Sequence, residues 1–139
     1  MANTGYDYEA SISVIDAAIT LTRGGTITDL SDALELDVDS GCIIYIDADY
    51  SNHAKATAGL IVSILRLVNA AGDTETVNGA SISFEMPFTQ AGTERKGIAL
   101  SGLYYHKFKI QLDWGNTTGS SAVTVATTIE KSDIPPASA

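Results

Sequence analysis

The sequence predicts an all-β protein, an antiparallel β-sandwich of the jelly-roll or immunoglobulin-like kind, with about seven to eight strands. Two observations lead to this fold class. Apolar and polar residues alternate with a period of two in several separate segments, which gives each segment one buried and one solvated face. Residues that favour turns separate these segments at short intervals, and short connections suit a meander or a Greek key.

The cleanest alternation occurs in segments 33–39, 81–89, 105–114 and 123–129. Each of them is expected to form a strand with one polar face. Because Pro87 cannot donate a ladder hydrogen bond, its strand should lie at a sheet edge or carry a bulge. The parity of these strands and of segment 42–50 predicts a core that includes Leu34, Leu36, Ile44, Ile46, Ile82, Phe84, Phe108, Ile110, Leu112 and Val125.

Three other runs are less regular. In segment 11–22 the apolar positions change parity, which predicts a bulge near Asp16 or a change of sheet. Segment 42–50 is apolar on both faces at first and alternates later, so it should begin deep in the core. Segment 60–68 is rich in β-branched residues and favours a strand, although its apolar spacing also fits a helix. Turns are expected at Gly24-Gly25, Ser40-Gly41, Asn78-Gly79 and 116–119.

The length of 139 residues fits a single domain with its own core. We expect an N-terminal arm at 1–10, one sandwich domain at 11–132 and a flexible C-terminal tail at 133–139. The arm has no strand pattern, but it contains Tyr6 and Tyr8. Because aromatic side chains anchor many interfaces, these two tyrosines are the candidate contacts to a partner or an adjacent subunit.

Composition and charge exclude several classes of partner. Eight Lys and Arg against 17 Asp and Glu give a net charge of -9, which would repel a phosphate backbone, so no nucleic acid is expected. The longest apolar-leaning run, 60–68, contains Arg66 and falls well short of the ~20 residues of a membrane helix. We therefore expect no membrane span, and the first residues do not resemble a secretory signal. Cys42, the only cysteine, lies in an apolar run and is expected to be a buried hydrophobe.

The densest group of carboxylates is Asp37, Asp39, Asp47 and Asp49. If their strands are neighbours across the turn at 40–41, these oxygens could bind Ca²⁺ or act as a glycosidase pair. Their alternation with apolar residues instead favours a solvated sheet face. The sequence therefore predicts no metal site here.

Motifs for catalysis are also missing from the sequence. His53 and His106 are the only histidines, and neither lies at metal-ligand spacing from another candidate ligand. His106 shares its parity with Phe108 and is expected at the edge of the core. No Gly-x-Ser-x-Gly elbow occurs, although catalytic triads are recognised by geometry rather than by sequence. We predict that the protein is not an enzyme, with no catalytic residue and no cofactor.

Aromatic residues suggest a different kind of site. Tyr104, Tyr105 and Trp114 lie on or beside one expected strand and could form a platform on which a sugar ring stacks. The parity of Trp114 matches that of Phe108, however, which places the indole in the core. Of the three, only Tyr105 is expected to point outward.

The C-terminal part of the chain combines the strand 104–112, the polar turn 116–120 and the hydroxyl-rich strand that begins at 123. Together with the acidity and the Ser-, Thr-, Ala-, Val- and Ile-rich composition, it resembles the head decoration or cement proteins of bacteriophages, by general style and without a diagnostic motif. The resemblance implies a structural virion protein without an active site. Such a protein folds in the host cytoplasm and then binds the major capsid protein on the capsid surface, commonly as a homotrimer. The alternative with the same fold is a carbohydrate-binding or fibre-tip sandwich that binds a glycan during host attachment.

Overall fold

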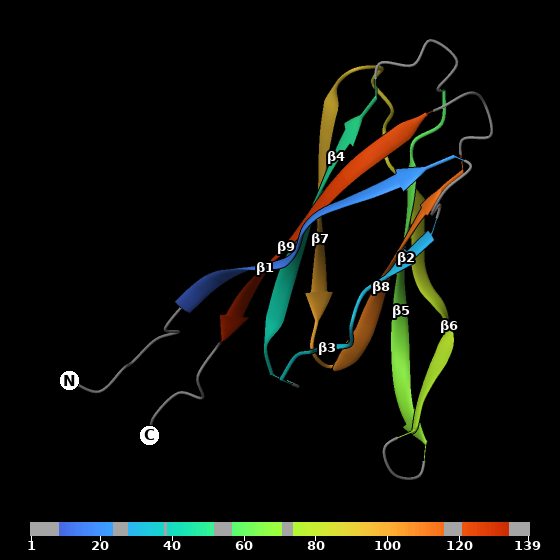
Figure 1. The fold of residues 1–139 in the computed structure, drawn as a ribbon. Coiled ribbons are helices and arrows are strands. Elements are labelled where there is room, and N and C mark those ends of the chain that lie inside the picture. Colours follow the sequence, from blue (N-terminus) through green and yellow to red (C-terminus); the bar gives the residue numbers. More distant parts are fainter. Residues whose placement is uncertain are drawn as a thin grey trace, which may run out of the picture.

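The structure is a computed structural model (Figure 1). It describes residues 9–23, 28–37, 39–51, 57–70, 74–115 and 121–133. In these ranges the regular structure consists entirely of strands: β1 Glu9–Thr22, β2 Thr28–Leu30, β3 Leu34–Glu35, β4 Gly41–Tyr50, β5 Leu60–Ala70, β6 Thr74–Glu85, β7 Thr93–Ser101, β8 Lys107–Trp114 and β9 Ala122–Asp133.

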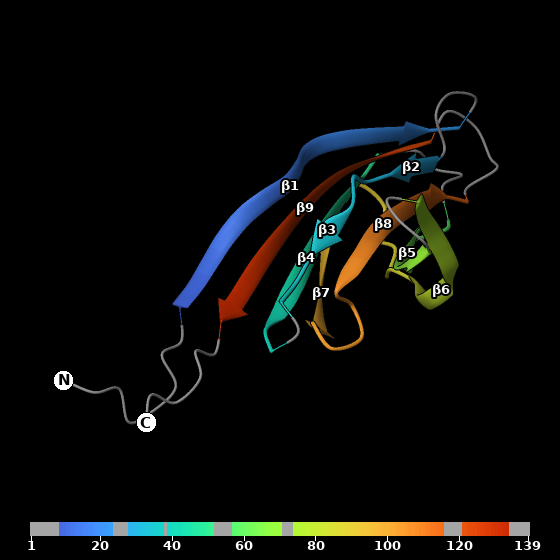
Figure 2. The ribbon, with the colours of Figure 1, turned by 90° about the horizontal axis from the view of Figure 1, so that it is seen from below.

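The strands form two antiparallel sheets that face each other (Figure 2). Sheet A has the order β1-β9-β4-β7, and sheet B has the order β2-β8-β5-β6, with β3 also paired to β8. Every paired strand runs antiparallel to its neighbour. The predicted all-β sandwich is therefore confirmed, and segment 60–68 belongs to a strand rather than a helix.

The core lies between the sheets and follows the alternation of the sequence. Along β4, every second residue from Cys42 to Tyr50 is buried, and β8 shows the same pattern from Phe108 to Trp114. Of the predicted core residues, Leu36, Ile44, Ile46, Phe108, Ile110, Leu112 and Val125 are buried, while Leu34, Ile82 and Phe84 are partly buried against them.

Tyr50 joins the two sheets at one end of the core. Its hydroxyl donates a hydrogen bond to the Pro87 carbonyl at 2.9 Å and accepts one from the Leu60 amide at 3.1 Å. Its ring packs edge-on against Phe88 at 4.9 Å between centroids and lies 5.6 Å from the ring of Trp114. Burial raises the pKa of Tyr50, so the phenol stays neutral and both of its polar roles are satisfied.

Two bulges shape the sheets. In β1 the register with β9 shifts between Val14 and Asp16 and again between Asp16 and Ile19, which confirms the predicted bulge. The turn expected at Asn78-Gly79 is wrong, because both residues lie inside β6. The register there shifts against β5, so this pair forms an irregularity within a strand, where a glycine often occurs.

The expectation that segment 33–39 pairs with segment 42–50 across the turn at 40–41 is also wrong. Only Leu34–Glu35 forms a strand, and it pairs with β8 in sheet B, whereas β4 belongs to sheet A. The chain crosses from one sheet to the other between β3 and β4. The hydrogen bond from the Ser40 amide to the Asp37 carbonyl, 3.1 Å long, closes the tight turn at this crossing.

Sequence reasoning missed β2 and β7. The inward positions of β7 include Glu94 and Lys96, so the strand has no continuous apolar face. As an edge strand, β7 can tolerate these charges. The Lys96 ammonium lies 4.6 Å from the ring centroid of Phe84 on β6, so a cation–π contact accommodates this inward charge between the edge strands of the two sheets.

Candidate binding faces

The outward side of sheet A carries one aromatic ring with charged partners, flanked by small residues. We call this surface the A face; it consists of Ile43, Tyr45, Asp47, Arg95, Gly97, Ala99, Thr124, Ala126, Thr128 and Glu130. The outward side of β8 in sheet B differs, because its residues are Lys107, Lys109, Gln111 and Asp113. No described element covers the A face, so its alanine and threonine side chains and the backbone at Gly97 are open to solvent or to a partner.

Tyr45 lies near the middle of the A face and is held in place on three sides. Its hydroxyl donates a hydrogen bond to Glu130 Oε2 at 3.0 Å. The Arg95 guanidinium lies 5.4 Å from the ring centroid and makes a bidentate ion pair with Asp47, with bonds of 2.7 and 3.0 Å. A Cβ on Gly97 would lie 3.3 Å from the ring, so the ring rests over bare backbone. Glycine at this position leaves room for the aromatic ring close to the backbone of β7.

Hydrogen bonds set the protonation states of Tyr45 and Arg95. The bond to Glu130 raises the pKa of Tyr45, and burial and the Glu130 charge add to the effect, while the Arg95 charge opposes it. The bond and the charge of Asp47 raise the pKa of Arg95. At neutral pH the A face therefore presents a neutral phenol beside a fixed cation and two carboxylates.

This network gives a testable titration. Glu130→Gln should lower the pKa of Tyr45, because an amide does not repel the phenolate. The raised pKa implies a contribution to stability that is complete below the ordinary tyrosine pKa and is lost as the pH rises through the raised value. The pKa of Tyr45 is measured by titrating the native protein and following phenolate absorbance. The titration step that Tyr45→Phe removes is assigned to Tyr45. An unchanged titration in Glu130→Gln would contradict the assignment.

The four aspartates of the predicted acidic cluster do not come together. Asp37 and Asp39 are exposed beside the turn before β4, whereas Asp47 and Asp49 lie much farther along that strand, on its outward side. Asp47 is paired with Arg95. The separation follows from the placement of β3 and β4 in different sheets, and the described residues hold no group of three or more potential metal ligands.

We expect that a chelator such as EDTA will leave the melting temperature unchanged. A cation bound only by the native state would stabilise it, and its removal would lower that temperature. Thermal unfolding followed by circular dichroism, with and without chelator, measures the effect. A reproducible drop that added Ca²⁺ reverses would restore a calcium site.

The aromatic platform, which the parity of Trp114 disfavoured, is not assembled. Tyr104 is 62% exposed. The expectation that Tyr105 points outward is wrong, because Tyr105 is half-buried and packs edge-on against Phe108 with centroids 6.3 Å apart. Trp114 is 2% exposed, as its parity predicted, and its Nε1 donates a 3.4 Å hydrogen bond to the Ser121 carbonyl. The aromatic side chain that sequence reasoning missed is Tyr45, a half-buried residue on the outward side of sheet A, whose position beside Gly97 depends on the pairing of β4 with β7.

Of the remaining candidate residues, the structure describes His106 and Cys42. His106 is exposed rather than at the core edge, and its Nδ1 donates to the Leu36 carbonyl at 2.6 Å. Cys42 is buried, and burial raises the pKa of its thiol to about 11, which fits an unreactive hydrophobe. His53 and the candidate contacts Tyr6 and Tyr8 lie outside the described residues.

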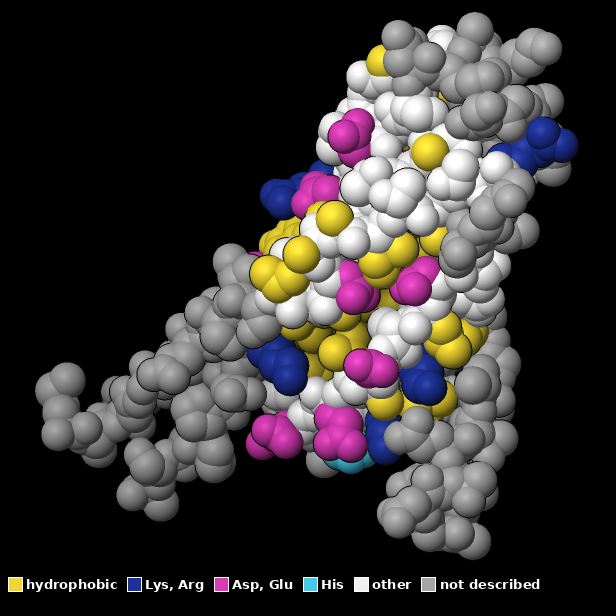
Figure 3. All heavy atoms as spheres, viewed as in Figure 1, with side chains coloured by type: hydrophobic (Ala, Val, Ile, Leu, Met, Phe, Trp, Pro, Cys, Tyr) yellow, Lys and Arg dark blue, Asp and Glu magenta, His cyan; other side chains and the backbone are white. Residues whose placement is uncertain are grey.

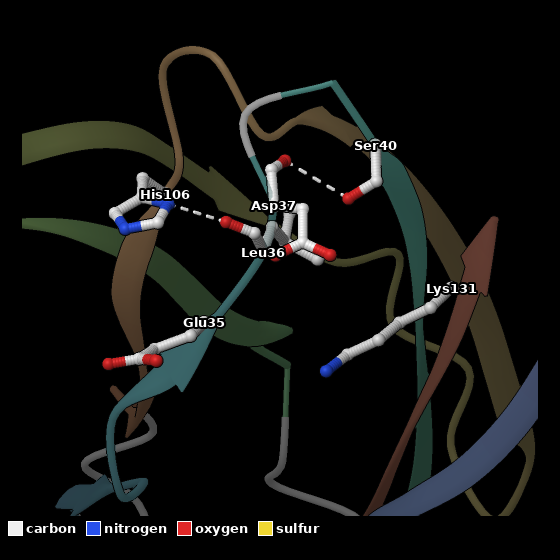
Figure 4. Close-up of a pocket in the computed structure, with 6 residues that line it drawn as sticks. All are labelled: Glu35, Leu36, Asp37, Ser40, His106 and Lys131. Carbon is white, nitrogen blue, oxygen red and sulfur yellow. Dashed lines mark hydrogen bonds between the residues drawn. The ribbon is translucent and has the colours of Figure 1, made fainter. Parts of the chain in front are cut away.

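A second surface feature is a groove beside β3, which we call the Lys131 groove. It has two parts that share Lys131, with volumes of about 360 and 290 Å³. Figure 4 shows the first part, where the Lys131 side chain extends from β9 toward β3. The lining residues are Glu35, Leu36, Asp37, Ser40 and His106 in the first part, and Val14, Ile15, Asp16, Asp32, Leu34 and Ile129 in the second.

In the described ranges no helix has the length and apolarity that crossing a membrane requires. No family model and no curated protein matches the chain. Among solved structures, that of infectious bursal disease virus, Gx strain, shares 11% identity at a TM-score of 0.49, over 95% of this chain and 33% of that one. The chain thus spans about a third of the length of that viral chain.

Two other solved structures overlap with most of both chains. A family 29 carbohydrate-binding module from Piromyces equi shares 16% identity at a TM-score of 0.41, over 90% of this chain and 92% of that one. The coat protein of tobacco streak virus shares 9% identity at a TM-score of 0.34, over 98% of this chain and 90% of that one.

Proposed function

We propose that this chain is a structural protein of a virus particle, a decoration or cement protein that binds the shell of a bacteriophage head through the A face. We also propose that it has no enzymatic activity. The observation that carries the proposal is the A face itself, where small residues surround the fixed group of Tyr45 and Arg95. The outward positions of β8 in sheet B instead carry long polar side chains.

Small side chains suit a docking surface because they let a partner approach the sheet backbone closely and lose little side-chain entropy on binding. Tyrosine and arginine are also the residues that most often dominate binding energy at interfaces. Tyr45 and Arg95 are already fixed by Glu130 and Asp47, so ordering them on contact would cost little free energy.

The overall charge of -9 supports the same proposal. A decoration protein must stay dissolved at high copy number before it binds, and a large net charge opposes self-association. A single copy of this domain offers limited area, while stable interfaces bury about 1,200–2,000 Å² in total. A homotrimer would multiply the contacts to the lattice and add avidity, so we propose that the bound form is trimeric.

The direct assay uses empty shells assembled from the major capsid protein encoded in the same genome. The purified chain should co-sediment with these shells at saturable, high copy number, and the particle-bound form should show three-fold clusters by cryo-electron microscopy. Absence of binding at any protein concentration tested would refute the decoration function. A strictly monomeric mass, both free and on the particle, would refute the trimer alone.

The second candidate function is carbohydrate binding, and the geometry around Tyr45 is the observation that favours it. A flat ring over Gly97 can stack against the apolar side of a sugar, and Arg95, Asp47 and Glu130 can exchange hydrogen bonds with sugar hydroxyls. Glycan-array binding that Tyr45→Ala abolishes and Tyr45→Phe retains would favour this function. Shell binding without any glycan signal would reject it.

A further inference from the structure

We propose that the free edge of β1 binds an extended, basic segment of a partner protein, which adds to sheet A as a new strand and places Lys or Arg side chains in the Lys131 groove. The inference concerns a surface separate from the A face, so it does not depend on the proposed function. It joins two independent observations, an unpaired backbone edge and an acidic groove beside it.

The backbone edge is the first observation. β1 is the terminal strand of sheet A, and no described strand pairs with it on the side opposite β9. Residues 9–14 pair in regular register with 128–133, and the bulge begins only after Val14. This half of β1 therefore offers a regular row of amide and carbonyl groups, which is the template that strand addition uses.

The other sheet edges are less suitable for strand addition. β6, the terminal strand of sheet B, has 12 residues, but its register with β5 shifts twice, so its regular stretches are shorter than residues 9–14 of β1. β2 and β3 have three and two residues, which is too short for a stable ladder. β7 carries Glu94, Arg95 and Lys96 in succession, and charged residues on an edge oppose pairing with another chain. β1 is therefore the edge best suited to strand addition, because it is long and lies beside the Lys131 groove.

The groove supplies the charge complementarity. Lys131 lines both parts, but carboxylates outnumber it, with Glu35 and Asp37 in the first part and Asp16 and Asp32 in the second. The second part opens beside the bulge, where the two aspartates flank an apolar floor. In Figure 3 acidic side chains border a patch of apolar surface near the middle of the molecule. Burial raises the pKa of Asp29 on β2, and the nearby charge of Asp16 adds to this effect, so these two acidic groups lie close together on this side of the sandwich. A cationic side chain would relieve this repulsion.

An apolar side chain of the same segment also has a place to bind. Val14 is 65% exposed beside half-buried Ile15 and Leu34, at the mouth of the groove. Side chains of an added strand alternate between the two sides of the sheet, so one set would point toward the groove. The segment that fits best therefore alternates basic and apolar residues.

The test uses three capped synthetic peptides and isothermal titration calorimetry. A peptide of alternating valine and lysine should bind, and binding should weaken as salt is added. The matched valine-glutamate peptide should not bind. The valine-lysine peptide with alternate amides N-methylated should bind more weakly, because it keeps its charges but loses the hydrogen-bond donors of one edge. Amide hydrogen exchange should slow in β1 when the first peptide is bound.

Asp16→Asn and Asp32→Asn should each weaken binding of the valine-lysine peptide by about 2–5-fold, because each removes one carboxylate from the groove. The control is Asp49→Asn, which removes an exposed carboxylate from the outward side of β4 and should leave binding unchanged. Equal binding of the N-methylated peptide would overturn strand addition. Equal binding of the glutamate peptide, or no binding of either peptide, would overturn the proposal as a whole.

Discussion

Phe108→Ala should lower the free energy of unfolding by about 3–5 kcal/mol, because the ring is 0% exposed and its removal leaves a cavity in the centre of the core. Its neighbour Lys109 points to the outer side of β8, so Lys109→Ala should change stability by no more than about 0.5 kcal/mol. Denaturant unfolding of both variants measures the difference. Equal effects at the two positions would contradict the placement of β8.

Gly102→Ala should be comparably damaging for a different reason. A Cβ at this position would lie 1.8 Å from the Asp37 carbonyl oxygen and 2.9 Å from that of Ser40. Both obstacles are backbone, and the Gly102 amide also donates to the Ser40 carbonyl at 2.9 Å, so the two loops would have to separate. We expect a loss of about 2–3 kcal/mol or more.

Gly97→Ala is the matched control for that substitution. There the nearest atoms belong to the side chains of Tyr45 and Ile43, at 3.3 and 3.4 Å, and these side chains can move. The loss of stability should stay below about 1 kcal/mol. Thermal and denaturant unfolding compare the two variants, and a Gly102→Ala protein as stable as Gly97→Ala would show that the approach of the two loops is not obligatory.

Much of the fold could be predicted from the sequence because the sheets bury one face each. The alternation in segments 107–114 and 123–129 identified the inward residues, although it placed Tyr105 and His106 on the wrong sides, and the parity shift near Asp16 identified the bulge. Segment 93–101 was missed because its inward positions include charged side chains at an open edge. The crossing of the chain after β3 was missed because no local pattern states which sheet a short strand joins.

The candidate site was harder to predict because it depends on register. Thr124, Ala126 and Thr128 were visible in the sequence as the polar face of one strand, and the absence of charge among them was the available signal. The contact of Tyr45 with Gly97 and its bond to Glu130 join β4 to strands about 50 and 85 positions away in the sequence, where only the fold fixes the pairing.

The central claim is that the A face docks on the shell, and charge placed in its middle tests it most directly. Ala126 lies opposite Asp47 in the ladder between β9 and β4, while Gln111 occupies an outward position on β8 in the other sheet. Ala126→Arg should reduce binding to the assembled shells by about tenfold or more, because a long cation prevents close contact, and Gln111→Arg should bind as the unmodified protein does. Shell binding by Ala126→Arg at unchanged affinity, with both variants folded, would contradict the claim.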